Sequence, residues 1–139
     1  MKKLTEQYKI LYLKELGDTR GNLVVAEGNG QDIPFNIRRV FYMYGSDKEV
    51  VRGKHANKKT EFVLINVSGT SKVKIDNGEE QKVIELNKPH MGLYIKNMVW
   101  KDMYDFTEDS VLLVLASEHY DGGEYIRDYD EFLQMVNNI

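Results

Sequence analysis

The sequence contains no cysteine. Disulfide bonds and thiolate metal sites are therefore excluded, and a reducing compartment is allowed. No apolar run approaches the roughly 20 residues that a membrane-spanning helix needs, and residues 1–9 are too polar for a signal peptide. P-loop, GxGxxG, GxSxG and HExxH motifs are also missing. These absences predict a cytoplasmic protein that has no membrane partner.

The charge of the chain is nearly balanced. Its 139 residues include 19 Lys and Arg against 22 Asp and Glu, which gives a formal net charge of −3 at pH 7. Because both signs are interspersed, we expect no general attraction to nucleic acid or to a membrane surface. The length suits a single domain, 1–139, with a buried core.

Short β-type segments separated by turns fill most of the chain. Residues 37–44 are rich in β-branched and aromatic side chains, 111–116 form an apolar run, and Asp76-Asn77-Gly78 is typical of a hairpin turn. Turn signals recur about every eight to twelve residues, as expected of an all-β sandwich or barrel. Further strands are predicted at 8–16, 23–27, 62–67, 72–75, 81–86 and 91–95.

The C-terminal end has a different pattern. Ile126, Tyr129, Phe132, Leu133 and Val136 recur at helical spacing, with acidic residues between them. This pattern predicts an amphipathic helix over about 124–137.

The segment 51–61 is basic and carries His55, one of only three histidines in the chain. Imidazole has an ordinary pKa near 6.5, which suits proton transfer at neutral pH, and neighbouring cations favour its neutral, base-competent form. A lone histidine is more often structural or on the surface. The setting between Gly53 and an apolar strand nevertheless favours a proton-transferring group beside an anionic ligand.

Arg38 and Arg39 lie near the start of the strand predicted at 37–44. An arginine fork suits phosphate, although solvated charge at a strand end is the simpler explanation. Adjacent strand residues point to opposite faces, so at most one of the two faces a barrel interior. The pattern alone does not say which one.

Metal binding is a weaker alternative for the basic segment. The position two residues after His55 is Asn57, and asparagine is a poor ligand for zinc or iron. His55 with Glu61 would supply too few ligands, and His90 and His119 have no spacing that completes a set. We therefore expect no metal and no cofactor.

The run Arg52-Gly53-Lys54-His55-Ala56-Asn57-Lys58 resembles the cupin superfamily and, within it, the WxcM/FdtA-like branch of dTDP-sugar 3,4-ketoisomerases. The resemblance covers nearly the whole chain, including the blocks 18–21, 33–42, 92–95, 99–100 and 111–121. It implies an all-β, single-domain cupin jelly roll (a double-stranded β-helix) with a short C-terminal helix. It also implies a homodimer in which about 1–16 are exchanged between subunits.

The implied activity is the conversion of dTDP-4-keto-6-deoxy-D-glucose to a dTDP-3-keto-6-deoxyhexose through an enediol, before amination to a 3-amino-3,6-dideoxyhexose for surface glycans. By position in the family pattern, Arg39 and Arg52 would bind the diphosphate, and His55 and Tyr42 would be catalytic. The implied substrate pocket also contains Arg20, Asn57, Trp100, Lys101 and Tyr104.

Two departures from the family pattern bear on the chemistry. Asn57 stands where a second histidine is common, and residues 100–104 lack the histidines often found there. Either His55 transfers every proton, or Tyr42, Lys101 or Tyr104 supplies a second acid. We expect the galacto product, with Arg20 and Lys101 as candidates for steering it. A nucleotide-sugar epimerase and a non-catalytic sugar- or nucleotide-binding cupin are the alternatives.

Overall fold

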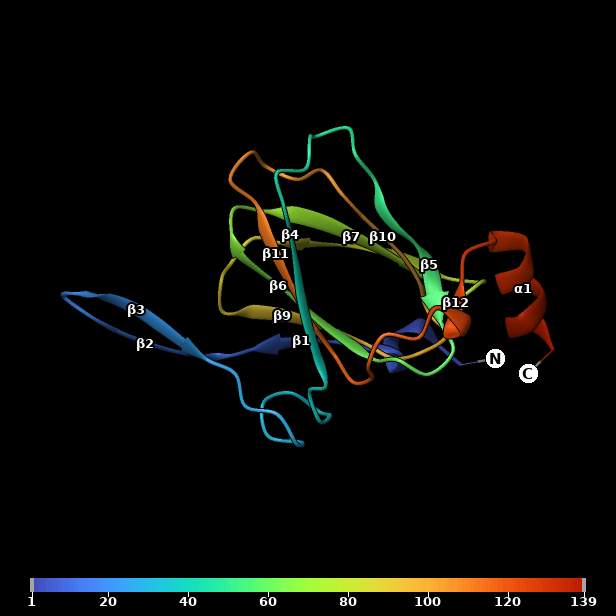
Figure 1. Ribbon diagram of the computed structural model, residues 1–139, viewed down its shortest axis with the longest axis horizontal. Coiled ribbons are helices and arrows are strands. Elements are labelled where there is room, and N and C mark those ends of the chain that lie inside the picture. The colour runs from blue at the N-terminus through green and yellow to red at the C-terminus, as the bar shows by residue number, and fades with distance from the viewer. Residues whose placement is uncertain (1, 139) are drawn as a thin grey trace.

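Two five-stranded antiparallel sheets face each other in the computed structural model, which describes residues 2–138 (Figure 1). The short 3-10 helix η1 (Leu4–Glu6) precedes the first strand. In spatial order, the first sheet consists of β1 (Tyr8–Tyr12), β9 (Met91–Ile95), β6 (Phe62–Ser68), β11 (Val111–Ala116) and β4 (Arg39–Tyr44). The second consists of β12 (Tyr125–Ile126), β5 (Arg52–Asn57), β10 (Trp100–Tyr104), β7 (Ser71–Asp76) and β8 (Gln81–Leu86).

Strands distant in the sequence are neighbours in both sheets. In the first sheet β11 pairs with β4 and β6, and in the second β10 pairs with β5 and β7. This order is that of a double-sheet jelly roll. The predicted fold class, an all-β cupin jelly roll with a short C-terminal helix, is confirmed.

Alternating side chains from the two inner faces form the main core. Leu64, Leu93 and Leu112 come from the first sheet and meet Val73 and Ile75 of the second; each is at most 1% exposed. Residues i and i+2 of a strand share one face, so each of these strands presents a single row of side chains to the opposite sheet.

The C-terminal helix α1 (Tyr129–Asn137) packs on the outer side of the second sheet at one end, where Phe132 lies on Ile126 and Trp100 (Figure 1). It begins several residues after the predicted start near 124. The carboxylate of Asp128 accepts a hydrogen bond from the Glu131 N–H and so caps the helix. The preceding residues form the 3-10 turn η2 (Gly122–Glu124) and the edge strand β12.

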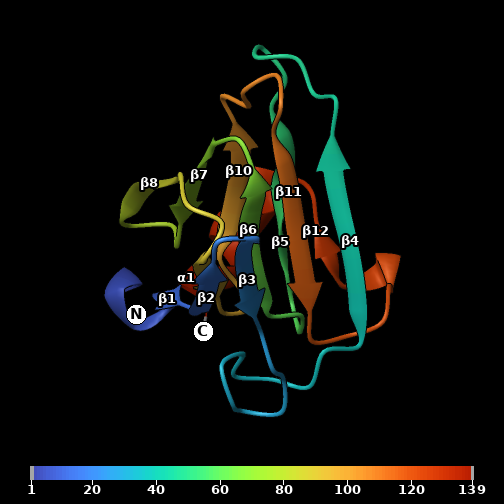
Figure 2. The ribbon, with the colours of Figure 1, turned by 90° about the vertical axis from the view of Figure 1, so that its left-hand side faces the viewer.

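The hairpin β2 (Lys14–Asp18) and β3 (Gly21–Val25) projects away from both sheets in Figure 1 and points toward the viewer in Figure 2. The predicted strand 8–16 is thus divided at Leu13, and its first part, β1, pairs with β9 of the same chain. Within residues 2–138, no helix has the length and apolar character needed to cross a bilayer.

Candidate active site

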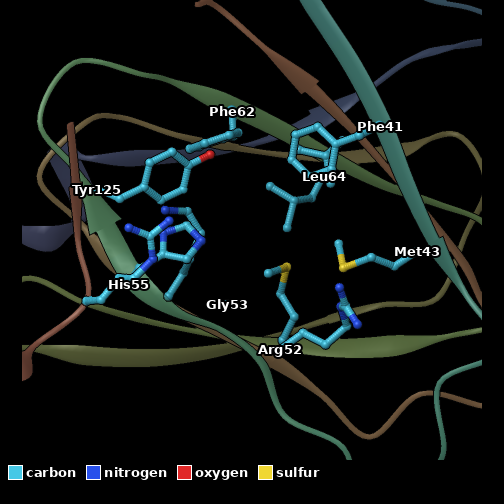
Figure 3. A pocket seen from close by; sticks show the side chains of 12 residues that line it. Phe41, Met43, Arg52, Gly53, His55, Phe62, Leu64 and Tyr125 are labelled. Carbon is cyan, nitrogen blue, oxygen red and sulfur yellow. The ribbon is translucent and has the colours of Figure 1, made fainter. Parts of the chain in front are cut away.

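A cavity of about 260 Å³ lies between the two sheets (Figure 3). Its first-sheet wall is apolar, and its second-sheet wall carries cations and a histidine. No carboxylate is among the lining residues that the structure describes. These are Phe41, Met43, Arg52, Gly53, His55, Phe62, Leu64, Lys101, Met103, Val114, Tyr125 and Arg127.

A β-bulge in β5 directs both Arg52 and His55 into this cavity. The two residues are three positions apart, so a regular strand would turn them to opposite faces. Arg52 is instead opposite Met103 and His55 is opposite Lys101, with Lys54 as the extra residue between them. Gly53 and Lys54 have φ values of 84° and 56°, and a side chain at Gly53 would come within 2.9 Å of the Lys101 carbonyl.

His55 is held as a neutral imidazole. Burial lowers its pKa to about 3, and the positive charge of Lys101 acts in the same direction. The ring of Tyr125 lies edge-on to the imidazole, with centroids 4.8 Å apart. At neutral pH the side chain therefore carries a free lone pair and can accept a proton.

Lys101 faces His55 across the β5–β10 pair and is only 3% exposed. Its ammonium nitrogen lies 4.7 Å from the centroid of the Phe62 ring and 3.5 Å from the Asn57 Oδ1. Burial lowers the pKa of Lys101 to about 7, against the opposing effect of the Glu124 charge. Near neutral pH this amine can therefore both donate and accept a proton.

Asn57 lies behind the cavity lining, at the centre of a buried polar cluster. Its Nδ2 donates to the Glu124 carboxylate at 2.7 Å, which turns its Oδ1 toward Lys101. Burial would raise the pKa of Glu124, but hydrogen bonds from Thr60, Asn57 and the Lys59 and Thr60 N–H groups hold it below its ordinary value. Asn57 thus orients Lys101 and does not itself line the cavity.

Arg39 lies next to the cavity from β4. Its Nη1 donates to the Tyr125 hydroxyl at 3.1 Å and its Nε to the Glu118 carbonyl at 3.2 Å. Its Nη2 is buried and has no hydrogen-bond partner among residues 2–138. An unsatisfied, charged donor in such a place requires an acceptor, which an anionic ligand can supply.

Tyr42 does not line the cavity, contrary to the sequence-based prediction. Strand β4 keeps a regular register with β11, so Arg39, Phe41 and Met43 face inward. Tyr42 points outward and is 60% exposed. The inward aromatic residue of β4 is Phe41, which has no ionisable group.

Three other predicted pocket residues lie elsewhere. Trp100 and Tyr104 flank the inward Lys101 and Met103 on β10 and face the other side of the sheet, where the Trp100 ring meets Tyr129 and Phe132 at 5.2 and 5.6 Å. Arg20 lies in the β2–β3 turn, with its side chain 89% exposed and ion-paired to Asp18. It lines a separate surface recess formed by the hairpin itself.

Tyr125 and Arg127 line the cavity but were not predicted. The sequence pattern assigned both to a helix, whereas β12 pairs Tyr125 with Asn57 and Ile126 with Ala56, directly beside His55. On an extended segment residues 125 and 127 share a face, so both reach the cavity while Ile126 packs under α1. The one signal in the sequence for the true start was Asp128, a residue type that favours the N-cap position just before Tyr129.

Few ligands for a metal are available here. Among residues 2–138 no three His, Cys, Asp or Glu side chains gather as a metal site would require. The residues present instead suit a phosphate-bearing ligand, through three guanidinium groups, and proton transfer, through His55 and Lys101.

Fold and site together define a class of protein, a jelly roll with a buried imidazole in a cationic cavity. Comparison with known proteins identifies the family within that class. The family described as FdtA, WxcM-like, C-terminal, matches residues 6–137. The chain is 43% identical over 131 residues, 94% of each chain, to a TDP-4-oxo-6-deoxy-alpha-D-glucose-3,4-oxoisomerase of Aneurinibacillus thermoaerophilus.

Solved structures agree. The sugar 3,4-ketoisomerase QdtA of Thermoanaerobacterium thermosaccharolyticum, in complex with TDP, has a TM-score of 0.92 and 45% identity over 95% of this chain and 96% of that one. The TDP-fucose-3,4-ketoisomerase WlaRA of Campylobacter jejuni has a TM-score of 0.89 and 41% identity, over 95% and 97%. The chain therefore belongs to the WxcM-like, C-terminal (FdtA) family, as predicted, and is an isomerase.

Proposed function

We propose that this protein is a 3,4-ketoisomerase that converts dTDP-4-keto-6-deoxyglucose to dTDP-3-keto-6-deoxygalactose. The observation that carries the proposal is the register pairing of His55 with Lys101, which puts a neutral imidazole and an amine of pKa about 7 on one wall of a cationic cavity. The related QdtA has been solved with TDP and, as a variant, with TDP-4-keto-6-deoxyglucose.

The arginines bind the diphosphate. Arg52 lines the cavity and Arg39 has an unpartnered Nη2 beside it, so both offer donors to phosphate oxygens. Arg127 adds a third guanidinium from the β12 side. A cavity of about 260 Å³ suits the sugar part of the substrate, with the nucleoside lying outside it.

His55 removes the hydrogen of C3, next to the C4 ketone. The C–H electrons form the C3–C4 double bond of an enediol, and the C4 oxygen takes up a proton. His55 then returns its proton to C4, while the C3 hydroxyl loses its own and becomes the new ketone. One hydrogen has moved between carbons and one between oxygens, so no cofactor is required.

Lys101 is the candidate for the proton on oxygen. Its pKa of about 7 means that it can give a proton to one oxygen and accept one from the other. The diphosphate brings negative charge near both groups, which raises the pKa of His55 and of Lys101 on binding. His55 thereby becomes a stronger base in the complex than in the free protein.

A base on one wall favours the galacto product. In a gluco-configured pyranose the hydrogens on C3 and C4 lie on opposite faces of the ring, and in a galacto-configured one they share a face. His55 and Lys101 come from neighbouring strands of one sheet, so a proton taken from C3 returns to C4 from the same side. The gluco product would need a donor on the opposite, apolar wall.

The homodimer is part of the same proposal. The outer face of β4 exposes Val40, Tyr42 and Tyr44, an apolar row at the edge of the first sheet. Residues 8–12 pair within their own chain, so the segment that reaches a partner is the projecting β2–β3 hairpin. Arg20, at its turn, can touch a substrate only in the cavity of the second copy.

The wider role follows from the product. A 3-keto sugar is the substrate that an aminotransferase needs to make a 3-amino-3,6-dideoxyhexose for surface glycans. A nucleotide-activated substrate of this kind supports a cytoplasmic location.

One experiment tests the activity directly. The protein is incubated with dTDP-4-keto-6-deoxyglucose in D₂O, and the product is analysed by mass spectrometry and NMR. A ketone moved to C3 with galacto configuration at C4 supports the proposal. Inverted centres with an unmoved ketone would indicate an epimerase instead. Binding of dTDP without exchange or rearrangement would indicate a non-catalytic cupin.

A further inference from the structure

Tyr125 is an ionisable side chain in the cavity that the proposed mechanism does not use. It lies on β12, opposite Asn57 of β5, and its ring is edge-on to His55 with centroids 4.8 Å apart. Figure 3 shows its hydroxyl directed into the cavity, on the side where Phe62 lies. The phenol therefore faces the space in which a sugar beside His55 would lie.

The hydrogen bonds of Tyr125 leave its own proton available. The hydroxyl oxygen accepts a hydrogen bond from the Arg39 Nη1 at 3.1 Å. A phenol can accept and donate at the same time, and among residues 2–138 its O–H has no acceptor. Since Arg39 supplies a donor to the oxygen, the phenolic hydrogen must point away from the guanidinium and can be given to a ligand.

The surrounding residues fix the ring before any ligand binds. The Arg127 guanidinium lies 4.7 Å from the ring centroid. Together with the His55 contact and the Arg39 hydrogen bond, this contact holds the hydroxyl in one place. A donor that is already oriented stabilises developing negative charge without a cost of reorganisation.

We propose that Tyr125 is a catalytic hydrogen-bond donor that stabilises the enediolate oxygen formed when His55 removes the neighbouring C–H proton. This inference rests on the proposed function. Negative charge develops on the C4 ketone oxygen as the C3–H bond breaks. C3 and C4 are neighbouring carbons of the sugar ring. Neighbouring catalytic groups such as His55 and Tyr125 suit that arrangement, and Arg39 behind the phenol makes its O–H a stronger donor.

The test compares Tyr125→Phe with Tyr120→Phe. Removal of one preoriented oxyanion donor typically lowers kcat by about 10²–10³-fold, and we expect a loss in this range for Tyr125→Phe with the Kd for dTDP changed by no more than about twofold. The kinetic isotope effect with C3-deuterated substrate should rise, because C–H cleavage becomes more rate-limiting. Tyr120 is 66% exposed and does not line the cavity, so Tyr120→Phe should match the wild type.

Two results would overturn the inference. One is wild-type kcat in Tyr125→Phe. The other is a much weaker dTDP complex with unchanged kcat, which would mean that the hydroxyl only positions Arg39. Either would leave the proposed function intact provided that the wild-type protein isomerises the sugar; no turnover by the wild type would refute the proposed function itself.

A measurement that keeps Tyr125 intact covers the case in which the Phe variant does not fold. The His55→Asn protein is labelled with ¹³Cζ-tyrosine and given either dTDP or dTDP-4-keto-6-deoxyglucose. The Tyr125 signal is identified as the one that shifts between the unliganded wild-type and His55→Asn proteins, because the Tyr125 ring lies against His55. It should move with the keto sugar and not with dTDP alone. Identical spectra in the two complexes would refute the hydrogen bond to the sugar oxygen.

Discussion

Strands β4 and β5 supply residues to the same cavity, but they present their side chains by different rules. Strand β4 alternates regularly, so Arg39, Phe41 and Met43 face inward and Tyr42 faces outward. Strand β5 contains a bulge at Gly53 and Lys54, so residues three apart face the same way. Strand alternation therefore predicts which residues of β4 face the cavity, but it does not predict this for β5. The four predictions below test this contrast.

The largest effect is expected at His55, the residue that the bulge turns into the cavity. General acid–base catalysis typically contributes about 10²–10⁴-fold, so His55→Asn should lower kcat at least that far while dTDP still binds. Steady-state kinetics measures kcat, and calorimetry measures the Kd for dTDP. Turnover close to the wild-type rate would show that another group is the base.

Lys101 is expected to have the next largest effect, and it also links activity to pH. Lys101→Met should lower kcat by about 10²-fold if the amine is the acid for the sugar oxygens. Its pKa of about 7 in the folded protein lies below the unfolded value. The unfolded chain therefore binds more protons between about pH 7 and pH 10, and wild-type stability should rise over that range, by at most about 1.4 kcal/mol per pH unit.

The same titration has a simple control. In Lys101→Met the buried amine is absent, so the variant should be more stable than the wild type at pH 6, and the difference should narrow as the pH rises. Urea unfolding of both proteins across this range measures the difference. If the free energies of unfolding of the two proteins change with pH in parallel, the pKa of the Lys101 amine is not lowered in the folded protein.

Gly53→Ala tests the bulge itself. A non-glycine residue in a strained left-handed conformation costs about 1–3 kcal/mol, and here the new methyl also meets the Lys101 carbonyl. We expect a lower free energy of unfolding and a loss of activity of roughly 10²-fold, since small displacements of a catalytic group have effects of that size.

Gly45→Ala is the matched control for this change. Gly45 also has a positive φ, of 69°, but a side chain there would meet no atom within 4 Å. It should lose stability through backbone strain while keeping its kcat. Equal losses of activity in the two variants would mean that the bulge does not position His55.

Tyr42→Phe should have the smallest effect. Because Tyr42 points out of the cavity, loss of its hydroxyl should leave kcat within about twofold of the wild type, a change of roughly 0.4 kcal/mol or less in the barrier. A large loss of kcat would restore Tyr42 as a second acid and would contradict the inward orientation of Phe41.

Much of the fold could be predicted because it depends on local patterns. Alternating and apolar runs identified most of the strands, and helical spacing identified α1. Strands β5 and β10 were not predicted. The start of the helix was wrong because Ile126 fits both patterns: on a helix it would face the core, and on β12 it packs under α1 against Phe132. Local periodicity cannot separate two structures that bury the same side chain.

The site was predicted less completely, for a similar reason. His55, Arg52 and Lys101 line the cavity, and Arg39 lies beside it. Tyr42 was placed there by its position in the family pattern, whereas the register of β4 with β11 turns Phe41 inward. Trp100 was counted as a pocket residue although its ring packs against α1. Conversely, Tyr125 and Arg127 were missed because strand pairing across almost 70 positions of the chain brings them to His55, and no sequence spacing indicates such a contact.

The sequence by itself determined the family, through its resemblance, and the jelly-roll class, through strand-forming patterns that are local properties. It also singled out His55 as the candidate base. The tertiary structure alone decided which face each residue occupies. The bulge at Gly53, the burial that lowers the pKa of Lys101, and the arrival of Tyr125 beside His55 all depend on neighbours from other strands. Burial and electrostatic environment are properties of the packed sheets, so they exist only once those strands have met.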